Sequence, residues 1–249
     1  MSRYLVISDI HSNIEALDAV LAASAKQRCS AVLVLGDLVG YGADPNAVVQ
    51  RIRELKPAAI IRGNHDKVAA AIDTAEDFNP MARLAADWTR RVLSEETVHY
   101  LRGLPAGPVV VQEELEICHG SPIDEDMYIV ADVDALRSIE LAAKPLCFFG
   151  HAHVAMRARL AAGHHIDIAS PQGHPEFETT LEAGSKYLFN PGSVGQPRDG
   201  DSRAAYAIAD LGAQQVTLYR VTYAIETAQK KILEAGLPPM LAYRLGMGR

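Results

Sequence analysis

The fold is decided by the stretch AVLVLGDLVGYG, which runs from residue 31 to residue 42. Its first five residues, 31–35, are all apolar, which is typical of a short strand that is buried in a sheet. Gly36 allows the backbone to leave that strand, so Asp37 stands at its carboxyl end. In open α/β sheets, ligands bind at the carboxyl ends of the strands. Asp37 is therefore the first candidate functional residue.

Four other apolar runs end in the same way. Each is followed by side chains that can bind a metal ion or transfer a proton: Asp9 with His11, Asn64 with His65, His119, and His151 with His153. A single residue of this kind has an ordinary structural explanation, as a helix cap or as a packed imidazole. The whole set has no such explanation, because a hydrophobic core has no use for it. The pattern predicts a metal centre with Asp37 in the middle.

The first third of the chain alternates strands and helices. We expect strands at 4–7, 31–35 and 58–61, with helices at 13–26 and 45–55 between them. This order implies right-handed crossovers and parallel pairing. The later pattern predicts a helix over 74–104, a hairpin at 109–118, a helix at 133–143, a strand at 146–149, further strands to residue 221, and a helix at 223–233 before a Pro-Pro tail. A pair of mixed sheets flanked by helices would bury all these strands.

The composition is that of an ordinary globular protein. With 249 residues, 49% of them hydrophobic and 22% charged, the chain can bury a sizeable core, and without a repeat or linker we expect one domain over 1–249. The net charge of -7 argues against non-specific binding to nucleic acid. No apolar run approaches the roughly 20 residues that span a bilayer. Three cysteines without C-x-x-C spacing, and the lack of a leader, indicate a cytoplasmic protein with reduced thiols.

The candidate ligands suit divalent metal ions. Asp9-x-His11 and His151-x-His153 each place two ligands just past a strand, where both side chains can turn toward one point. Carboxylate and imidazole together suit borderline divalent ions such as Mn, Fe, Zn or Ni. The full set of candidate ligands is Asp9, His11, Asp37, Asn64, His119, His151 and His153. Because one tetrahedral zinc takes four ligands, this set fits two adjacent ions that share a carboxylate.

The ordered motifs resemble those of the calcineurin-like metallophosphoesterase superfamily, and within it the small bacterial phosphodiesterases. That family's pattern is D-x-H, GD, GNH followed by D or E, a lone H, and GH-x-H. Here the blocks are Asp9-Ile10-His11, Gly36-Asp37, Gly63-Asn64-His65-Asp66, His119 and Gly150-His151-Ala152-His153, followed by Asn190-Pro191-Gly192-Ser193-Val194. The resemblance implies a four-layer α/β/β/α sandwich of two mixed sheets. The chain departs from the family at 74–105 and 121–143, which we read as cap-like insertions that govern substrate choice.

By that resemblance, Asp37 bridges two ions. One ion would be held by Asp9, His11, Asp37 and His153, and the other by Asp37, Asn64, His119 and His151. Two ions about 3.5–4 Å apart can clamp a phosphoryl group and supply a bridging hydroxide that attacks phosphorus in line. His65, not needed as a ligand, would then protonate the leaving alkoxide as general acid, and Asp66 would fix its tautomer.

Three further residues are candidates for substrate contact. Tyr41, between two glycines beside Asp37, either borders the substrate or only packs in a turn. Arg198 could pair with a phosphate, as arginine does bidentately, or form a surface salt bridge with Asp199 or Asp201, and Arg62 has the same capacity for phosphate. The remaining histidines read as surface residues: His99, His164, His165 and His174.

These observations favour a dinuclear-metal phosphoesterase that acts on phosphodiesters or small phosphomonoesters. Within the enzyme class, the alternatives are a protein phosphatase and a dinucleoside polyphosphate hydrolase. The acidic charge disfavours a nuclease. A non-catalytic binding protein on the same fold is the alternative from another class, although no ligand position is lost. The expected partner is a small phosphorylated substrate, and we expect no association with a membrane. The sequence does not specify the substrate, the metal or the oligomeric state.

Overall fold

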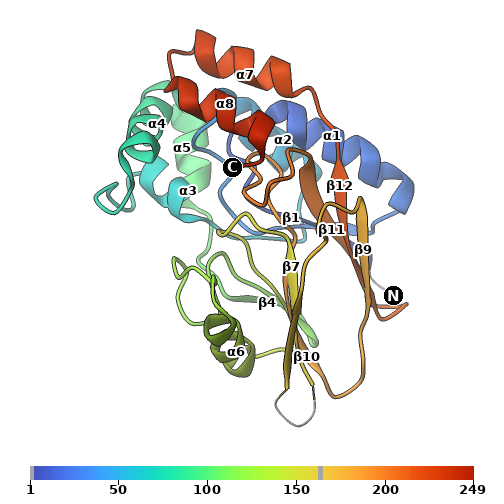
Figure 1. Ribbon diagram of the computed structural model, residues 1–249. Coiled ribbons are helices and arrows are strands. Elements are labelled where there is room, and N and C mark those ends of the chain that lie inside the picture. Colours follow the sequence, from blue (N-terminus) through green and yellow to red (C-terminus); the bar gives the residue numbers. More distant parts are fainter. Residues whose placement is uncertain (1–2, 162–164) are drawn as a thin grey trace.

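The computed structural model describes residues 3–161 and 165–249, and it forms two six-stranded sheets (Figure 1). The first sheet has the order β3-β2-β1-β11-β12-β9 and the second the order β4-β5-β6-β10-β7-β8. Strands of the first sheet are β1 (Arg3–Ile7), β2 (Ala31–Val34), β3 (Ala59–Ile60), β9 (Glu176–Thr180), β11 (Ala204–Asp210) and β12 (Gln215–Val221). Those of the second are β4 (Val109–Gln112), β5 (Leu115–Ile117), β6 (Leu146–Phe148), β7 (Met156–Leu160), β8 (Ile166–Ala169) and β10 (Lys186–Asn190).

Both sheets are mixed. In the first sheet β1, β2 and β3 pair in parallel, as the alternation of strands and helices predicts, and β11 joins β1 antiparallel. In the second sheet β6 pairs in parallel with both β5 and β10, while the outer pairs are antiparallel. Parallel neighbours bring their carboxyl ends to the same edge of a sheet. The polar residues that follow β1, β2 and β3 therefore emerge side by side.

Alternating side chains of β1 serve two different cores. Tyr4 and Val6 of β1 face the second sheet and pack there with Phe148 and Phe189. Leu5, from the other face of the same strand, packs in the core that includes α1 (Ile14–Ser24) and α2 (Pro45–Leu55). Successive side chains of a strand point to opposite faces, so a strand covered on both sides must be apolar throughout. The short η1 (Ala25–Gln27) follows α1.

Helices complete the outer layers. Helix α6 (Asp132–Leu141) lies against the second sheet (Figure 1). It packs on the far face of that sheet through Ala135 and Ile139. The order of layers is therefore α/β/β/α, which confirms the predicted architecture. Of the predicted insertion at 121–143, the helix belongs to the sandwich itself. The loop before it is held by ion pairs of Glu125 and Asp126 with Arg62 and Lys67.

A fourth core gathers helices that the sequence pattern predicts incompletely. It joins α4 (Pro80–Val92), α7 (Ile225–Glu234) and α8 (Pro239–Met247) around Tyr41. The expected helix over 74–104 is instead two helices, α4 and α5 (Glu95–Arg102), since Leu93 is extended and the Ser94 hydroxyl caps α5. The expected Pro-Pro tail is wrong, because Pro239 occupies the first turn of α8, where proline is tolerated. Within the described residues, no helix is long and apolar enough to cross a membrane.

Candidate metal centre

The seven predicted ligands all follow the carboxyl ends of strands, six in loops and Asn64 at the start of a helix. Asp9 and His11 follow β1, Asp37 follows β2, and Asn64 follows β3 as the first residue of the short helix α3 (Asn64–Ala69). The second sheet supplies His119 after β5, and His151 and His153 between β6 and β7. The structure brings all these loops together, so residues from both sheets meet at one place.

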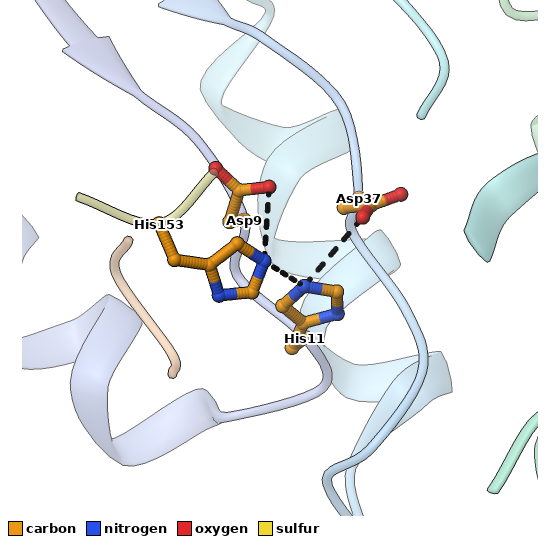
Figure 2. A group of neighbouring side chains, drawn as sticks. All are labelled: Asp9, His11, Asp37 and His153. Atoms are coloured by element: carbon orange, nitrogen blue, oxygen red, sulfur yellow. Dashed lines mark hydrogen bonds and ion pairs between the residues drawn. The ribbon is translucent and has the colours of Figure 1, made fainter. Parts of the chain in front are cut away.

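The first group of ligands is Asp9, His11, Asp37 and His153 (Figure 2). One potential ligand atom from each of these buried residues lies within 4.8 Å of the others. The Nε2 atoms of His11 and His153 are 3.0 Å apart. Nε2 of His153 is 3.4 Å from an oxygen of Asp9, and Nε2 of His11 is 3.5 Å from Oδ2 of Asp37. This set is the one that the resemblance to the family implies for one ion.

The tautomers of His11 and His153 explain why the first group suits a metal cation. The Nδ1 atom of His11 lies 3.0 Å from the carbonyl oxygen of Val39, and that of His153 lies 2.6 Å from the carbonyl oxygen of Gln196. A carbonyl only accepts, so each Nδ1 carries the hydrogen, and burial keeps both imidazoles neutral by lowering their pKa well below the usual value. The two Nε2 lone pairs then face each other, and a metal cation is the group that satisfies both.

The second group is Asp37, His119 and His151, again buried and within 4.8 Å. Asn64 joins it, since its Oδ1 lies 3.3 Å from Nε2 of His119. Nδ1 of His119 donates to the carbonyl oxygen of Leu35 at 2.7 Å, which aims Nε2 at the group. Nε2 of His151 is buried without a hydrogen-bond partner among the described residues. The donors again suit a borderline divalent ion.

One oxygen atom connects the two groups. Oδ2 of Asp37 lies 3.5 Å from Nε2 of His11 in the first group and 3.5 Å from Nε2 of His119 in the second. The other oxygen, Oδ1, accepts a hydrogen bond from the backbone N–H of His65 at 2.9 Å, which holds the carboxylate in place. This is the geometry that the predicted bridging role of Asp37 requires.

Charge is distributed unevenly over the two groups. Burial raises the pKa of Asp9 to about 6, in spite of His119 nearby. Burial would also raise the pKa of Asp37, but His119 and His65 outweigh it and hold that pKa well below its usual range. Although burial opposes it, the charge of Asp37 raises the pKa of His119 to about 10. A proton on Nε2 of His119 thus lies where a metal ion would bind. A metal ion would displace this proton, because metal ligands bind in their deprotonated form.

The ligand loops have an unusual backbone. Asp9, His11, Asp37, His151 and His153 all have φ between 49° and 64°, in the left-handed region. Non-glycine residues held there cost of order 1–3 kcal/mol each, and such residues concentrate at functional sites. Gly63 allows a close approach, since a Cβ at that position would lie 2.1 Å from Oδ1 of Asp37. The fold therefore holds these side chains in place at a cost to its own stability.

Asp66 does not have its predicted role. Its carboxylate accepts hydrogen bonds from the backbone N–H groups of Leu38 at 2.9 Å, Val39 at 3.2 Å and Gly63 at 3.0 Å. The Nδ1 atom of His65 has no hydrogen-bond partner in the described part of the chain. The prediction that Asp66 fixes the tautomer of His65 is therefore wrong. Asp66 instead ties the loop that carries Asp37 to the loop that carries Asn64.

His65 donates its backbone N–H to Asp37, but among the described residues its imidazole makes no hydrogen bond to the metal groups. Its ring is 4.9 Å from that of His11 and 4.4 Å from that of Tyr41, centroid to centroid. A Cβ on Gly40 would come within 2.5 Å of Nδ1, so the backbone at Gly40 covers that nitrogen and leaves Nε2 for other partners. Burial lowers the pKa of His65 to about 4, so the imidazole is neutral at pH 7 and carries one N–H. Its role as proton donor stays a prediction.

The three predicted substrate residues have different surroundings. Arg62 forms a bidentate pair with Glu125, at 3.0 and 3.2 Å, which gives its guanidinium a structural partner in place of a phosphate. Tyr41 is buried edge-on against His11, with ring centroids 4.8 Å apart. The guanidinium carbon of Arg198 lies over that tyrosine ring, 5.6 Å from its centroid.

Arg198 does not form the salt bridge that was its alternative explanation. Asp199 pairs with Arg220 and Asp201 pairs with Arg203. Arg198 donates instead to Oε1 of Gln196 at 3.0 Å, and its buried Nε has no partner among the described residues. Its charge also acts on several histidines of both metal groups. Arg198 is therefore a cation at the edge of the metal centre.

Sequence reasoning missed several residues around the centre. The ring of Phe78 lies 4.5 Å from that of His65, and the ring of Tyr128 stacks on His151 at 3.7 Å. Arg244 of α8 places its guanidinium 5.9 Å from the ring of Tyr41. These residues come from a loop, a second loop and a helix without any motif in common. Only the structure could bring them together.

The block after the last metal motif supports the ligand loops. The hydroxyl of Ser193 donates to the carbonyl oxygen of Asp9 at 2.7 Å, and the amide of Asn190 donates to the carbonyl oxygen of Gly150 at 2.8 Å. The histidines read as surface residues lie apart from both groups: His99, His165 and His174 are exposed, and His164 lies outside the described residues.

Known proteins agree with this architecture. A metallophosphoesterase from Sphaerobacter thermophilus is 38% identical, with a TM-score of 0.88 and coverage of 100% of this chain and 99% of that one. An uncharacterised protein of Methanocaldococcus jannaschii is 34% identical over 256 residues, which cover 100% of this chain and 99% of the relative. A hypothetical protein from Pyrococcus horikoshii OT3 shares the fold, with a TM-score of 0.79, 18% identity and coverage of 100% and 99%.

The family model points the same way as the geometry. The model of the calcineurin-like phosphoesterase superfamily domain matches residues 3–214, which include all seven ligand residues and the block around Ser193. The buried groups of aspartate and histidine could hold divalent metal ions, as a metal-dependent phosphoester hydrolase requires. From the motifs, the two sheets and the buried ligand groups together, this chain belongs to the calcineurin-like phosphoesterase superfamily.

Proposed function

We propose that this protein hydrolyses phosphoesters at two divalent metal ions, one held by each ligand group. The observation that carries the proposal is the shared Oδ2 of Asp37, which lies 3.5 Å from a histidine of each group. A carboxylate oxygen in that position can bind two ions at once. Asn64 and His151 complete the second group, and Asp9 and His153 the first.

The donor set narrows the choice of metal. Nitrogen from histidine with oxygen from aspartate and asparagine suits Mn, Fe, Zn or Ni better than Mg or Ca, which prefer oxygen alone. Two such ions, when bound, polarise a phosphoryl group and lower the pKa of bound water, which allows hydrolysis without a protein nucleophile. We use Mn²⁺ as the first ion to test.

The residues beside the two groups would bind and orient the substrate. Arg198 presents a guanidinium with a free buried Nε, which fits a non-bridging phosphate oxygen. Tyr41 supports that guanidinium through its ring and closes the site above His11. Nε2 of His65 faces away from Gly40 and would donate a proton or hydrogen bond to the leaving oxygen.

A small substrate fits best. The cavity beside His65 has a volume of about 180 Å³, which suits a phosphodiester or phosphomonoester of low mass. Its outer wall carries carboxylates, which disfavour the polyphosphate chain of a dinucleoside polyphosphate. We also propose that the protein works in the cytoplasm, because its cysteines, Cys29, Cys118 and Cys147, are all free thiols.

The test combines metal analysis with hydrolysis assays. The purified protein is stripped with a chelator, reloaded with Mn²⁺, and analysed for bound metal by mass spectrometry. Rates are then measured with p-nitrophenyl phosphate and bis(p-nitrophenyl) phosphate. We expect two ions per chain and hydrolysis of at least one substrate. The Asp37→Asn variant should lose both the paired ions and the hydrolysis. One ion per chain, or no hydrolysis with two ions bound, would overturn the proposal.

A further inference from the structure

The cavity of about 180 Å³ opens directly from the second ligand group. Asn64, His65 and His151 line its inner end. His65 and His151 are only 5% and 4% exposed, and Nε2 of His151 is buried without a hydrogen-bond partner among the described residues. Nδ1 of His65 is covered by Gly40, which leaves Nε2 as the nitrogen of His65 that is free for a ligand. Buried polar groups are normally paired, so the inner end of this cavity has the character of a ligand site.

The place of His65 indicates which part of a substrate enters the cavity. This step rests on the proposed function, in which His65 serves the leaving oxygen. A proton donor must lie within hydrogen-bond reach of the atom that it protonates. Since His65 lines this cavity, the alcohol that leaves from a phosphoester must extend into it.

Aromatic rings form much of the cavity wall. Tyr41, Phe78 and Tyr128 all line it. Phe78 is held against His65, with ring centroids 4.5 Å apart, and Tyr128 is stacked on His151 at 3.7 Å. An aromatic face carries a negative potential and attracts an ammonium group placed over it.

The outer wall adds negative charge. Its carboxylates are Asp73, Asp77 and Asp126, and no lysine or arginine occurs among the described residues that line the cavity. Asp77 has no ion pair in the described ranges, and Asp73 is 3.6 Å from Nζ of Lys67.

The cations behind that wall do not neutralise it. Lys67 also pairs with Glu125 and Asp126, and Arg62 pairs with Glu125. Together with Asp77, four carboxylates face two basic side chains on this outer wall, which is therefore negative. The other cations, Arg198 and Arg244, lie over the ring of Tyr41.

We propose that this cavity binds an ammonium group on the leaving alcohol, so that the preferred substrates are phosphoesters of cationic amino alcohols such as choline. The phosphate lies at the metal groups and Arg198, while the ammonium group lies among the rings and carboxylates. Aromatic cages with acidic neighbours recognise quaternary ammonium groups in this manner. A leaving group that carries further phosphates meets like charge at the outer wall.

The experiment compares isosteric leaving groups. Phosphocholine and its methyl diester are assayed beside 3,3-dimethylbutyl phosphate and its methyl diester, in which carbon replaces the charged nitrogen. We expect kcat/KM to favour the choline esters by about 10-fold, the size that one well-placed cation–aromatic contact supplies. This ratio compares substrates on one enzyme preparation, so metal loading does not affect it.

Variants of residues that line the cavity test whether it causes the preference for choline esters. Asp77→Asn and Phe78→Leu should each reduce the ratio by about 3-fold or more, since each removes part of the attraction for a cation. Asp87→Asn is the matched control, because Asp87 is an exposed aspartate of α4 that lines a different cavity. Asp77 lies in an exposed loop, so its variant tests the proposal even where Phe78→Leu fails to fold.

The outcomes separate this inference from the proposed function. Equal rates for the choline and dimethylbutyl esters would overturn the inference and leave phosphoester hydrolysis standing. A stronger preference for adenosine 5′-monophosphate would overturn it in favour of base stacking on the same rings. If no ester is hydrolysed, calorimetry with choline and with neutral 3,3-dimethyl-1-butanol tests the cavity without turnover. Selective binding of choline supports the cavity assignment, and equal or absent binding refutes it.

Discussion

Replacing Asp66 by asparagine tests the structural role that the carboxylate has in place of a catalytic one. The carboxylate serves three buried N–H groups: Oδ1 accepts from Leu38 and Val39, and Oδ2 accepts from Gly63. In the Asp66→Asn variant, the amide oxygen can still accept from Leu38 and Val39. The amide NH₂ then meets the N–H of Gly63, so two donors face each other and neither is satisfied.

The expected loss of stability follows from those three bonds. A hydrogen bond to a charged group contributes about 1.5–3 kcal/mol, and a neutral one about 0.5–1.5 kcal/mol. Burial raises the pKa of Asp66 to about 7, so the comparison is made above that pH, where the carboxylate is charged. There the variant loses one charged bond and weakens two, while removal of a buried charge offsets part of the cost. We expect the free energy of unfolding to fall by about 2–4 kcal/mol. Metal affinity should fall too, because Asp66 joins the loops of Asp37 and Asn64.

Urea unfolding followed by circular dichroism measures this loss, with and without Mn²⁺. Asp134→Asn is the matched control, since Asp134 occupies the same third helical position in α6, but its bonds to Val130 at 3.4 Å and Ala131 at 3.0 Å are exposed. The control should cost about 1 kcal/mol or less. If Asp66→Asn kept its stability within about 1 kcal/mol of the wild type and altered only the pH dependence of the rate, Asp66 would orient His65 after all.

Three further predictions follow from the site. Asp37→Asn should abolish activity at saturating Mn²⁺, while Asn64→Ala retains some, because Asp37 faces both groups and Asn64 one; assays beside metal analysis decide. His65→Ala should keep both ions and slow alkyl esters by about 10²–10⁴-fold, but nitrophenyl esters much less; equal slowing would contradict proton donation. Glu125→Gln should cost about 0.5–1 kcal/mol near pH 7, since Arg62 and Lys67 outweigh burial and lower the pKa of Glu125. That difference should fade as the pH falls below about 4.5, where Glu125 becomes protonated in the wild type, and a constant difference in urea titrations would refute the ion pairs.

The ligands could be predicted from the sequence because each follows a buried strand. Asp9 and Asp37 each come two positions after an apolar run, and parallel strands bring such positions together without any knowledge of side-chain contacts. The division into two groups that share Asp37 was implied by the resemblance to the family and not by this rule. The rule cannot predict the left-handed backbone at Asp37, because nothing in the sequence distinguishes an aspartate with φ of 52° from one in a β conformation.

The prediction that Asp66 fixes the tautomer of His65 failed for a geometrical reason. His65 and Asp66 are neighbours in sequence, but both belong to α3, and adjacent residues of a helix do not face each other. The cavity wall was beyond prediction for another reason. Phe78 and Tyr128 lie in loops 50 positions apart, and no periodicity relates loop residues to a site.

Because both sheets contribute ligands to one site, metal binding affects how long the folded protein persists in a cell. His11 and His153 are separated by 142 positions, yet their Nε2 atoms lie 3.0 Å apart, one from each sheet. Any ion bound between them ties the sheets together and is lost when they separate. An ion at 100 times its dissociation constant adds about 2.7 kcal/mol to the free energy of unfolding. Metal starvation would then expose the chain to proteases, so its abundance would follow the supply of metal.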